Sequence, residues 1–259
     1  MCFDTDSRPP IVPIAGGALD SRRLVLTGAD GNRLVAFEAR ATVPSGSAIL
    51  VLPDVRGLHP YYEELVLRFA EHGVGALAID WFGRTAGVEP RPPTFEYRPH
   101  VNQTTWAGIQ SDIRAGAEAL RSVAAGAERT CFSVGFCFGG RMSFLAATLG
   151  LGLAGVIGFY GSPTGTHYTG SPAPAEVATE MRGRVLGVYG GADGGIPAGH
   201  VAAFDDALAA AGVDHRLITY PDAPHSFFDR KASEYADASA AAWDEMLRFV
   251  LGEGERPDA

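Results

Sequence analysis

Short apolar runs alternate with amphipathic segments along most of the chain, and this alternation constrains the fold more than any other feature. The run 48–52 (AILVL) is continuously apolar, as expected for a strand buried on both faces of a sheet. Between such runs, apolar residues recur every three or four positions, which is the period of a helix with one buried face. Strands that alternate with helices predict an α/β fold with a mostly parallel central sheet and helices on both faces. The predicted strands are 48–52, 75–79, 130–135, 155–160, 185–189 and 215–220, and the predicted helices are 61–72, 106–125, 139–149, 201–211 and 235–251.

The first part of the chain follows a different pattern. Residues 24–26 and 34–37 have strand character, and the turn-forming residues 28–32 (GADGN) join them. This arrangement predicts an antiparallel hairpin at one edge of the sheet. Residues 1–20 are rich in proline and glycine and are predicted to form an extended arm. No repeat or linker divides the remainder, so we expect a single domain over residues 1–259.

Composition argues against two classes of partner. The 259 residues carry a formal net charge of −9, and an acidic surface repels both nucleic acid and anionic lipid. Glycines divide the apolar stretch 142–160, which favours a helix end, a turn and a buried strand over a membrane span. Neither nucleic acid nor a membrane is therefore expected as a partner.

The cysteines and histidines restrict the chemistry further. Three cysteines, Cys2, Cys131 and Cys137, are too few for a disulfide framework and indicate a reducing, cytoplasmic setting. The N-terminus lacks the apolar run of a secretory signal. Cys131 falls inside a predicted strand and is expected in the core. The histidines show no metal-ligand spacing and the glycines form no phosphate loop, so no metal or cofactor is expected.

Residues 135–139 (GFCFG) lie between a predicted strand and a predicted helix. Gly-x-Cys-x-Gly has the pattern of a nucleophile elbow with cysteine in place of serine. Glycine is needed two residues before and after the nucleophile, because a side chain there would clash with neighbouring backbone. The turn would place Cys137 at a helix N-terminus, which favours its thiolate, and would point the Phe138 N–H at a developing oxyanion. A buried structural cysteine in a glycine-rich turn is the alternative interpretation.

Two later residues complete a catalytic order. Asp193 follows the predicted strand 185–189, and His225 follows the predicted strand 215–220. Hydrolases with this elbow carry nucleophile, acid and histidine in that chain order, each after a strand. The sequence thus predicts a triad of Cys137, His225 and Asp193. Taken singly, Asp193 is as well explained by a turn or a helix cap, and His225 by a solvated loop.

Over nearly its whole length the chain resembles the dienelactone hydrolase family. The resemblance is carried by residues 80–84 (DWFGR), 135–140 (GFCFGG), 158–161 (GFYG), 190–193 (GGAD) and 225–227 (HSF). It implies an α/β-hydrolase fold and the cleavage of a small ester or enol-lactone through an acyl-thioester. It also implies that Cys137 is the nucleophile, His225 the base and Asp193 the residue that orients the base. The N–H groups of Phe138 and Val55 would form the oxyanion hole.

The resemblance also assigns residues that contact substrate. Arg84 matches the first of two arginines that bind a substrate carboxylate in this family. Asp229 stands at the second arginine position, and a carboxylate there would repel an anionic lactone. We therefore do not expect dienelactone itself to be the preferred substrate. Four other arginines could compensate, although an ordinary surface charge is the favoured interpretation of each: Arg56, Arg91, Arg98 and Arg230.

Asp54 matches a carboxylate that precedes the second oxyanion donor in the family and influences the charge of the cysteine. Aspartate is shorter than the glutamate of the founding enzymes, so the sequence does not decide whether the Asp54 carboxylate contacts the Cys137 thiol. Six aromatic residues are expected to line the site or to serve only in packing: Trp81, Phe82, Phe95, Tyr97, Tyr160 and Phe227.

Several other functions compete with that of a carboxylic ester or lactone hydrolase. A glutaminase-like thiol hydrolase would carry glutamate two residues after the histidine, where this chain has Phe227. A non-catalytic ligand-binding relative would be expected to lack a triad member, and a redox sensor would need a partner thiol near Cys137. Hydrolysis of other activated esters, such as thioesters and phosphoesters, is a further alternative. The protein is expected to act on a small molecule, without a cofactor, as a monomer or loose homodimer.

Overall fold

A central sheet of eight strands organises the computed structural model, which describes residues 6–14, 20–92, 94–123 and 130–252. The strand order is β1-β2-β4-β3-β5-β6-β7-β8; the β1–β2 and β2–β4 pairs are antiparallel, and all the other neighbouring pairs are parallel. The antiparallel pair forms the predicted edge hairpin. The strands are β1 (Asp20–Thr27), β2 (Arg33–Arg40), β3 (Ser47–Leu52), β4 (Gly75–Ile79), β5 (Thr130–Phe136), β6 (Gly155–Phe159), β7 (Arg184–Gly190) and β8 (His215–Tyr220).

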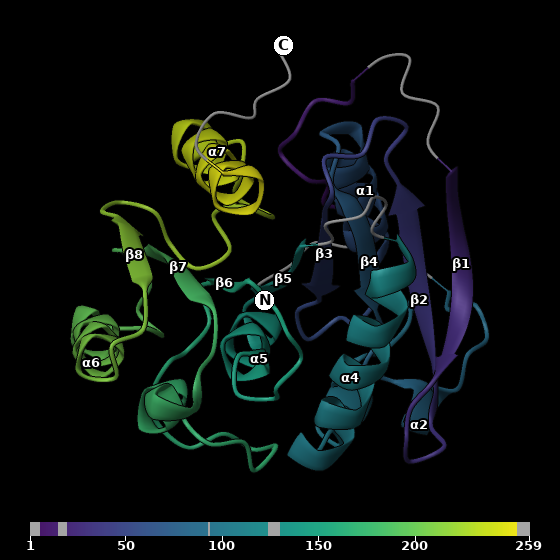
Figure 1. Ribbon diagram of the computed structural model, residues 1–259, viewed down its shortest axis with the longest axis horizontal. Helices are drawn as coiled ribbons and strands as arrows, with labels where there is room; N and C mark the ends of the chain where they lie inside the picture. The colour runs from purple at the N-terminus through teal and green to yellow at the C-terminus, as the bar shows by residue number, and fades with distance from the viewer. Residues whose placement is uncertain (1–5, 15–19, 93, 124–129, 253–259) are drawn as a thin grey trace.

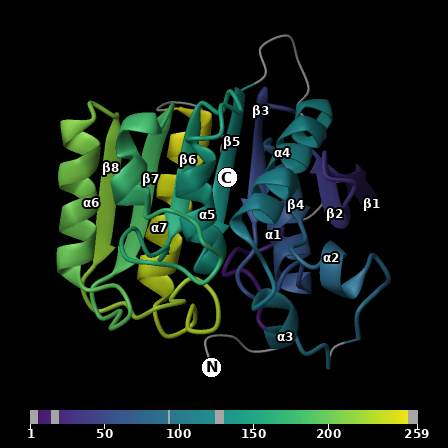
Figure 2. The same ribbon diagram turned by 90° about the horizontal axis from the view of Figure 1, so that it is seen from below.

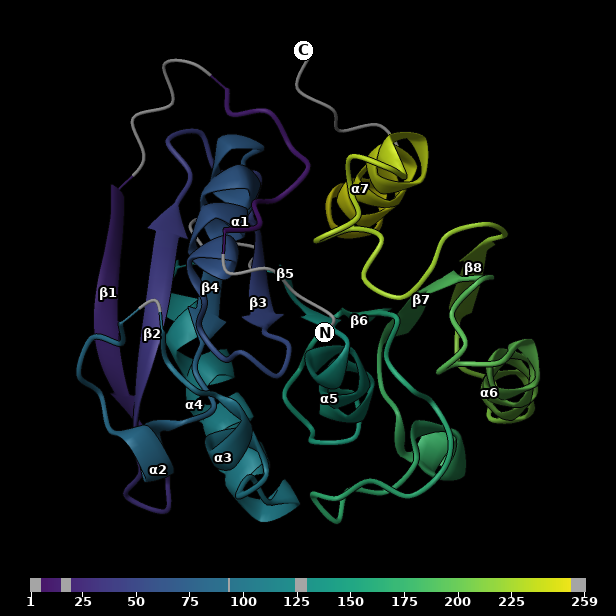
Figure 3. The ribbon, with the colours of Figure 1, turned by 180° about the vertical axis from the view of Figure 1, so that it is seen from behind.

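Helices cover both faces of the sheet, as the alternating pattern predicts (Figures 1 and 3). Helices α1 and α7 lie on one face, and α4, α5 and α6 lie on the other. The fold class inferred from the sequence is therefore confirmed. The helices are α1 (Pro60–Glu71), α2 (Gly83–Ala86), α3 (Arg98–Val101), α4 (Trp106–Val123), α5 (Phe138–Ala146), α6 (Ala198–Ala210) and α7 (Ala236–Leu251), with a 3-10 helix η1 (Pro174–Glu180).

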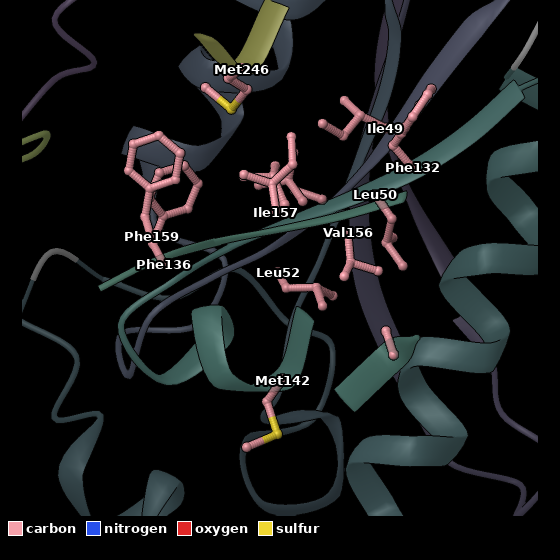
Figure 4. Close-up of a cluster of buried hydrophobic side chains, with 14 of the residues drawn as sticks. Ile49, Leu50, Leu52, Phe132, Phe136, Met142, Val156, Ile157, Phe159 and Met246 are labelled. Carbon is pink, nitrogen blue, oxygen red and sulfur yellow. The ribbon is translucent and has the colours of Figure 1, made fainter. Parts of the chain in front are cut away.

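The core follows from the apolar strands, whose successive side chains point to opposite faces of the sheet. Strand β4 and strand β6 are buried along their whole length. Figure 4 shows the two layers that result. Phe136, Ile157 and Phe159 lie on the side of Met246 of α7, whereas Leu52 and Val156 lie on the side of Met142 of α5. Each continuous apolar run thus contributes side chains to the hydrophobic layers on both faces of the sheet.

The observed elements differ from the predicted ones mainly where no period could guide the prediction. The irregular segments after β4 and β6 contain α2, α3 and η1, which are too short to show a helical repeat. Helix α5 ends three residues earlier than predicted, and α6 begins three residues earlier, directly after Pro197. The predicted end of the helix 106–125 lies outside the described residues, as do Cys2 and parts of the arm 1–20.

Residues 6–14 contain no helix or strand. Their contacts include an ion pair of Arg8 with Glu64 and a hydrogen bond from the Ile14 N–H to Glu71, with both glutamates on α1. Across the described residues, no helix combines the length and apolarity that a membrane span requires.

The carboxyl ends of the parallel strands meet at one edge of the sheet (Figure 2). The segments that follow β3, β4, β5, β6, β7 and β8 all leave from this edge. Ligands of open parallel sheets bind at such an edge. It is also where the sequence places its candidate catalytic residues.

Candidate active site

Cys137 occupies the sharp turn between β5 and α5. Its backbone has φ 55° and ψ −111°, a conformation that side-chain-bearing residues rarely adopt, and its N–H donates to the carbonyl of Phe159 at 2.9 Å. A Cβ at Gly135 would lie 1.8 Å from the Gly139 oxygen, and a Cβ at Gly139 would lie 2.0 Å from the Leu52 oxygen. Glycine is therefore required on both sides of the cysteine, as the elbow pattern predicts.

Asp193 and His225 form a hydrogen-bonded pair at the same edge. His225 Nδ1 lies 2.6 Å from Asp193 Oδ2, and the other carboxylate oxygen accepts the Gly195 N–H at 2.9 Å. The Asp193 side chain is almost fully buried, whereas that of His225 is 26% exposed. A buried carboxylate on Nδ1 fixes the ring orientation and leaves the other ring nitrogen directed away from the acid.

Tyr160 connects this pair to the elbow. Its ring centroid lies 4.9 Å from that of His225, and its neighbour Phe159 accepts the backbone hydrogen bond from Cys137. Burial raises the pKa of Tyr160 well above its usual value, and the charges of Asp229, Asp54 and Cys137 raise it further. The Tyr160 hydroxyl group therefore stays protonated at neutral pH.

The two predicted oxyanion donors lie at the ends of neighbouring strands. Phe138 is the first residue of α5, and Val55 lies in the turn that follows β3, which the Gly57 N–H closes onto the Asp54 carbonyl at 3.1 Å. Within the described ranges, neither the Phe138 N–H nor the Val55 N–H donates a hydrogen bond to the protein. Both groups can therefore donate to a ligand.

Arg56 forms a buried ion-pair cluster with Asp54 and Asp229. Its Nη2 lies 2.7 Å from Asp54 Oδ2 and also bonds Asp229, and the Tyr62 hydroxyl donates to Asp54 at 2.7 Å. Arg56 Nη1 further donates to Ser7 of the arm at 3.0 Å. Asp54 Oδ1 accepts the Arg56 backbone N–H at 2.7 Å, so both Asp54 oxygens are engaged. Because Asp54 and Arg56 flank Val55 in the chain, the cluster positions the turn that carries the Val55 N–H.

One cation and two carboxylates leave this cluster with excess negative charge. Burial raises the pKa of Asp229 to about 6, although the Arg56 guanidinium acts to lower it, and Asp54 raises it further. From the sequence, Arg56 was predicted only as one of four arginines that could compensate for the negative charge of Asp229. No local signal pairs it with Asp229, which lies 173 residues away along the chain.

Replacing Asp229 with asparagine should flatten the dependence of stability on pH between about pH 4 and pH 6, by about 1–3 kcal/mol in total. The pKa of Asp229 is about 6 in the folded protein against 3.8 as the ordinary value, so folding takes up a proton in this range. The stability due to protonated Asp229 is present below pH 4 and is lost as the pH rises through 6. Urea unfolding of both proteins across this range measures the difference, and superimposable profiles would contradict it.

Arg84, the predicted carboxylate-binding residue, lies in a different network. Its Nη1 is 2.6 Å from Asp112 of α4, and its Nη2 is 2.5 Å from Asp30 of the β1–β2 turn. It lines a small surface pocket together with Trp81 and Thr104. Two carboxylates already neutralise this guanidinium. Of the other candidate arginines, Arg91 pairs with buried Asp80, and Arg98 is exposed on α3.

The aromatic residues divide into two groups. Trp81 packs edge-on against Phe138 at 5.5 Å, and Tyr160 packs against His225, so both adjoin the candidate catalytic groups. Phe227 is fully buried behind Tyr160, at 5.9 Å between ring centroids, and therefore packs rather than faces a ligand. Cys131 is buried in β5, as predicted.

Arg141, the fourth residue of α5, lies beside the site and was not predicted from the sequence. It is 2% exposed and makes five hydrogen bonds to the segment after β6, four of them to main-chain carbonyls. These acceptors are Ser162, Thr164, Gly165, Ser171 and Pro172. Burial lowers the pKa of Arg141 to about 10, which still leaves it charged at neutral pH. The cation fixes the segment that lies beside Phe138.

The chain is similar to known proteins along most of its length. Residues 34–252 match the Dienelactone hydrolase family. A protein of Escherichia coli (strain K12) named "Putative carboxymethylenebutenolidase" is 30% identical over 227 residues, which span 85% of this chain and 82% of that protein. A Salmonella typhimurium protein of the same name is 29% identical over 254 residues, spanning 95% and 92%. The crystal structure of a "Putative Dienelactone Hydrolase" from Klebsiella pneumoniae aligns with a TM-score of 0.75 at 26% identity, over 91% of this chain and 99% of that one.

Proposed function

Since the chain belongs to the dienelactone hydrolase family, we propose that it hydrolyses small, uncharged carboxylic esters or lactones through Cys137, His225 and Asp193. The observation that carries this proposal is the 2.6 Å hydrogen bond between His225 and Asp193 at the sheet edge where Cys137 occupies its strained turn. A nucleophile in an elbow and an oriented histidine are the parts that covalent acyl transfer requires.

The proposed reaction proceeds in two acyl transfers. Asp193 holds the proton on His225 Nδ1, so Nε2 accepts the thiol proton as Cys137 Sγ attacks the carbonyl carbon. The resulting oxyanion accepts hydrogen bonds from the N–H groups of Phe138 and Val55. Collapse expels the alkoxide, which takes the proton from His225, and leaves a thioester on Cys137. Water then loses a proton to His225 and attacks the thioester, which releases the acid and returns the proton to sulfur.

The position of Cys137 supports its role as a nucleophile. It immediately precedes the first turn of α5, where the helix dipole and unpaired N–H groups favour a negative charge. Thiolates leave readily from thioesters but attack unactivated esters slowly. Activated esters with good leaving groups are therefore the expected substrates.

The preference for an uncharged substrate rests on the charges around the site. Asp54 and Asp229 share one arginine, and Arg84 is neutralised by Asp30 and Asp112. Arg56, Arg84 and Arg91 are each paired with carboxylates, so none of these three guanidinium groups is left to attract a substrate carboxylate. We expect kcat/KM for p-nitrophenyl acetate to exceed that for dienelactone by about 10-fold or more. Steady-state rates on both substrates measure this ratio, and a preference for dienelactone would contradict the charge argument.

The test of the mechanism is to trap the acyl-enzyme. Wild-type protein mixed with p-nitrophenyl acetate and quenched in acid should carry one acetyl group on Cys137. Trypsin releases Cys131 and Cys137 in one peptide, Thr130–Arg141, so fragment ions must distinguish the two. Buried Cys131 is the internal control. Acetylation of Cys131, or turnover without any acetylated cysteine, would overturn the proposal.

A further inference from the structure

Four aromatic rings from two separate loops and a helix form one contiguous cluster beside the elbow, in which Phe138 meets Trp81 edge-on and Tyr168 nearly face to face. Phe138 is 5.5 Å from Trp81, 5.7 Å from His167 and 6.2 Å from Tyr168, measured between ring centroids. The His167 and Tyr168 rings are 4.3 Å apart. We call Trp81, Phe138, His167 and Tyr168 the aromatic shelf.

The aromatic shelf runs from the core to the solvent. Trp81 and Phe138 are almost fully buried, whereas Tyr168 is 55% exposed, one of the few large apolar side chains in the described residues that reach the surface. Its ring lies nearly parallel to that of Phe138, at 18°. A ring that is more than half exposed to solvent therefore lies next to Phe138, the residue that carries a proposed oxyanion donor.

The outer end of the aromatic shelf is joined to the segment before α4 by a hydrogen bond between Tyr168 and Thr104. Burial raises the pKa of Tyr168 to about 12, and the charge of Cys137 raises it further, while a hydrogen bond with Thr104 opposes the rise. Thr104 and Trp81 also line the small pocket that contains Arg84. Tyr168 thus contacts the segment between β4 and α4, which also carries Trp81.

The aromatic shelf is uncharged at neutral pH. Burial lowers the pKa of His167 to about 4, and the Arg141 cation lowers it further, so the imidazole stays neutral. Its Nδ1 lies 2.8 Å from the Thr169 hydroxyl. Neutral rings without a fixed charge favour an apolar, flat partner over an ionic one.

The aromatic shelf is also held in place. Arg141 binds the carbonyls on either side of His167 and Tyr168, at Gly165 and Pro172. The Trp106 N–H donates to Thr169 at 2.8 Å and ties the same segment to the start of α4. Rings that are already ordered lose little conformational freedom when a ligand stacks on them.

We infer that the aromatic shelf binds an uncharged aryl group of the substrate, and that Tyr168 is a specificity-determining residue. This inference rests on the proposed ester hydrolysis and narrows its substrate class. The aryl group could belong to the acyl portion or to the alcohol portion of the ester, because both flank the carbonyl that Cys137 attacks. In either case it stacks on the exposed face of Tyr168 while the carbonyl oxygen meets the Phe138 N–H.

Three esters separate these possibilities. Vinyl acetate has no aryl group, phenyl acetate carries one on the alcohol portion, and vinyl benzoate carries one on the acyl portion. The quantity measured is kcat/KM for each aryl ester divided by that for vinyl acetate, which cancels intrinsic reactivity when variants are compared. The variants are Tyr168→Ala, which removes the ring, and Tyr168→Phe, which keeps it. Neither change is expected to disturb folding, since the side chain is more than half exposed.

Tyr168→Ala should lower one of the two ratios by about 5- to 20-fold, mainly through KM, as expected for the loss of one stacked ring. Tyr168→Phe should keep both ratios within about twofold of wild type. The ester whose ratio falls identifies the portion that carries the aryl group. If the wild type hydrolyses all three esters and Tyr168→Ala leaves both ratios unchanged, the inference that the aromatic shelf binds an aryl group is wrong, whereas the proposed ester hydrolysis still stands. A wild type inactive on all three would overturn the proposed function as well.

Discussion

Replacing Cys137 with alanine should lower kcat/KM for p-nitrophenyl acetate by at least about 10³-fold. The reason is that Cys131, the other cysteine among the described residues, is buried in β5, so the hydrogen-bonded pair of His225 and Asp193 would have no nucleophile to activate. The fold should persist, because alanine has the same backbone demands as cysteine at φ 55°. Stopped-flow or steady-state hydrolysis assays measure the rate, and circular dichroism checks the fold.

Cys131→Ala is the matched control, because it removes the other described cysteine from the same strand-helix unit. Its kcat/KM should stay within about threefold of wild type, with a modest loss of stability from the small cavity. Should Cys137→Ala keep more than about a tenth of the wild-type rate, water activated directly by His225 would become the better mechanism.

Replacing Arg56 with methionine should destabilise the fold by about 3–5 kcal/mol at neutral pH. Arg56 is 7% exposed and is the shared partner of buried Asp54 and Asp229, so its removal leaves two carboxylates without a counter-charge. Denaturant unfolding gives the change in free energy. The loss should shrink at about pH 5, because Asp229, with a pKa of about 6, is then protonated.

Arg98→Met is the control for Arg56→Met, because Arg98 is exposed on α3 and its loss should change stability by less than about 0.5 kcal/mol. Activity gives a second readout, since the turn of Asp54, Val55 and Arg56 carries the second oxyanion donor. We expect kcat to fall in Arg56→Met even where the protein is still folded. Equal stability of the two variants would show that the cluster contributes nothing to the fold.

Much of the fold could be predicted from local pattern. Runs such as 48–52 and 75–79 became central strands because only a strand covered on both faces buries every residue of so short an apolar run. The residues Gly135 and Gly139 predicted the elbow because their missing side chains are a steric requirement of that turn. Helices of four residues, such as α2 and α3, carry no such signature and escaped the prediction.

The candidate catalytic residues were also accessible from the sequence. Cys137, Asp193 and His225 each follow a strand, and parallel strands bring their carboxyl ends together whatever the intervening chain contains. Chain order and strand position were therefore sufficient to predict that Asp193 and His225 would meet.

The sequence by itself determined the sheet, the strained turn at Cys137 and the chain order of the catalytic candidates, because each depends on neighbours within a few residues or on strand direction. Only the tertiary structure decided which charges cancel and which rings stack. Arg84 pairs with Asp30 and Asp112, 54 and 28 residues away, and Arg56 pairs with Asp229, 173 residues away. The aromatic shelf likewise joins Trp81 to Tyr168 across Phe138. Such contacts form between side chains that no local period relates, so they arise only when the sheet brings distant loops to one edge.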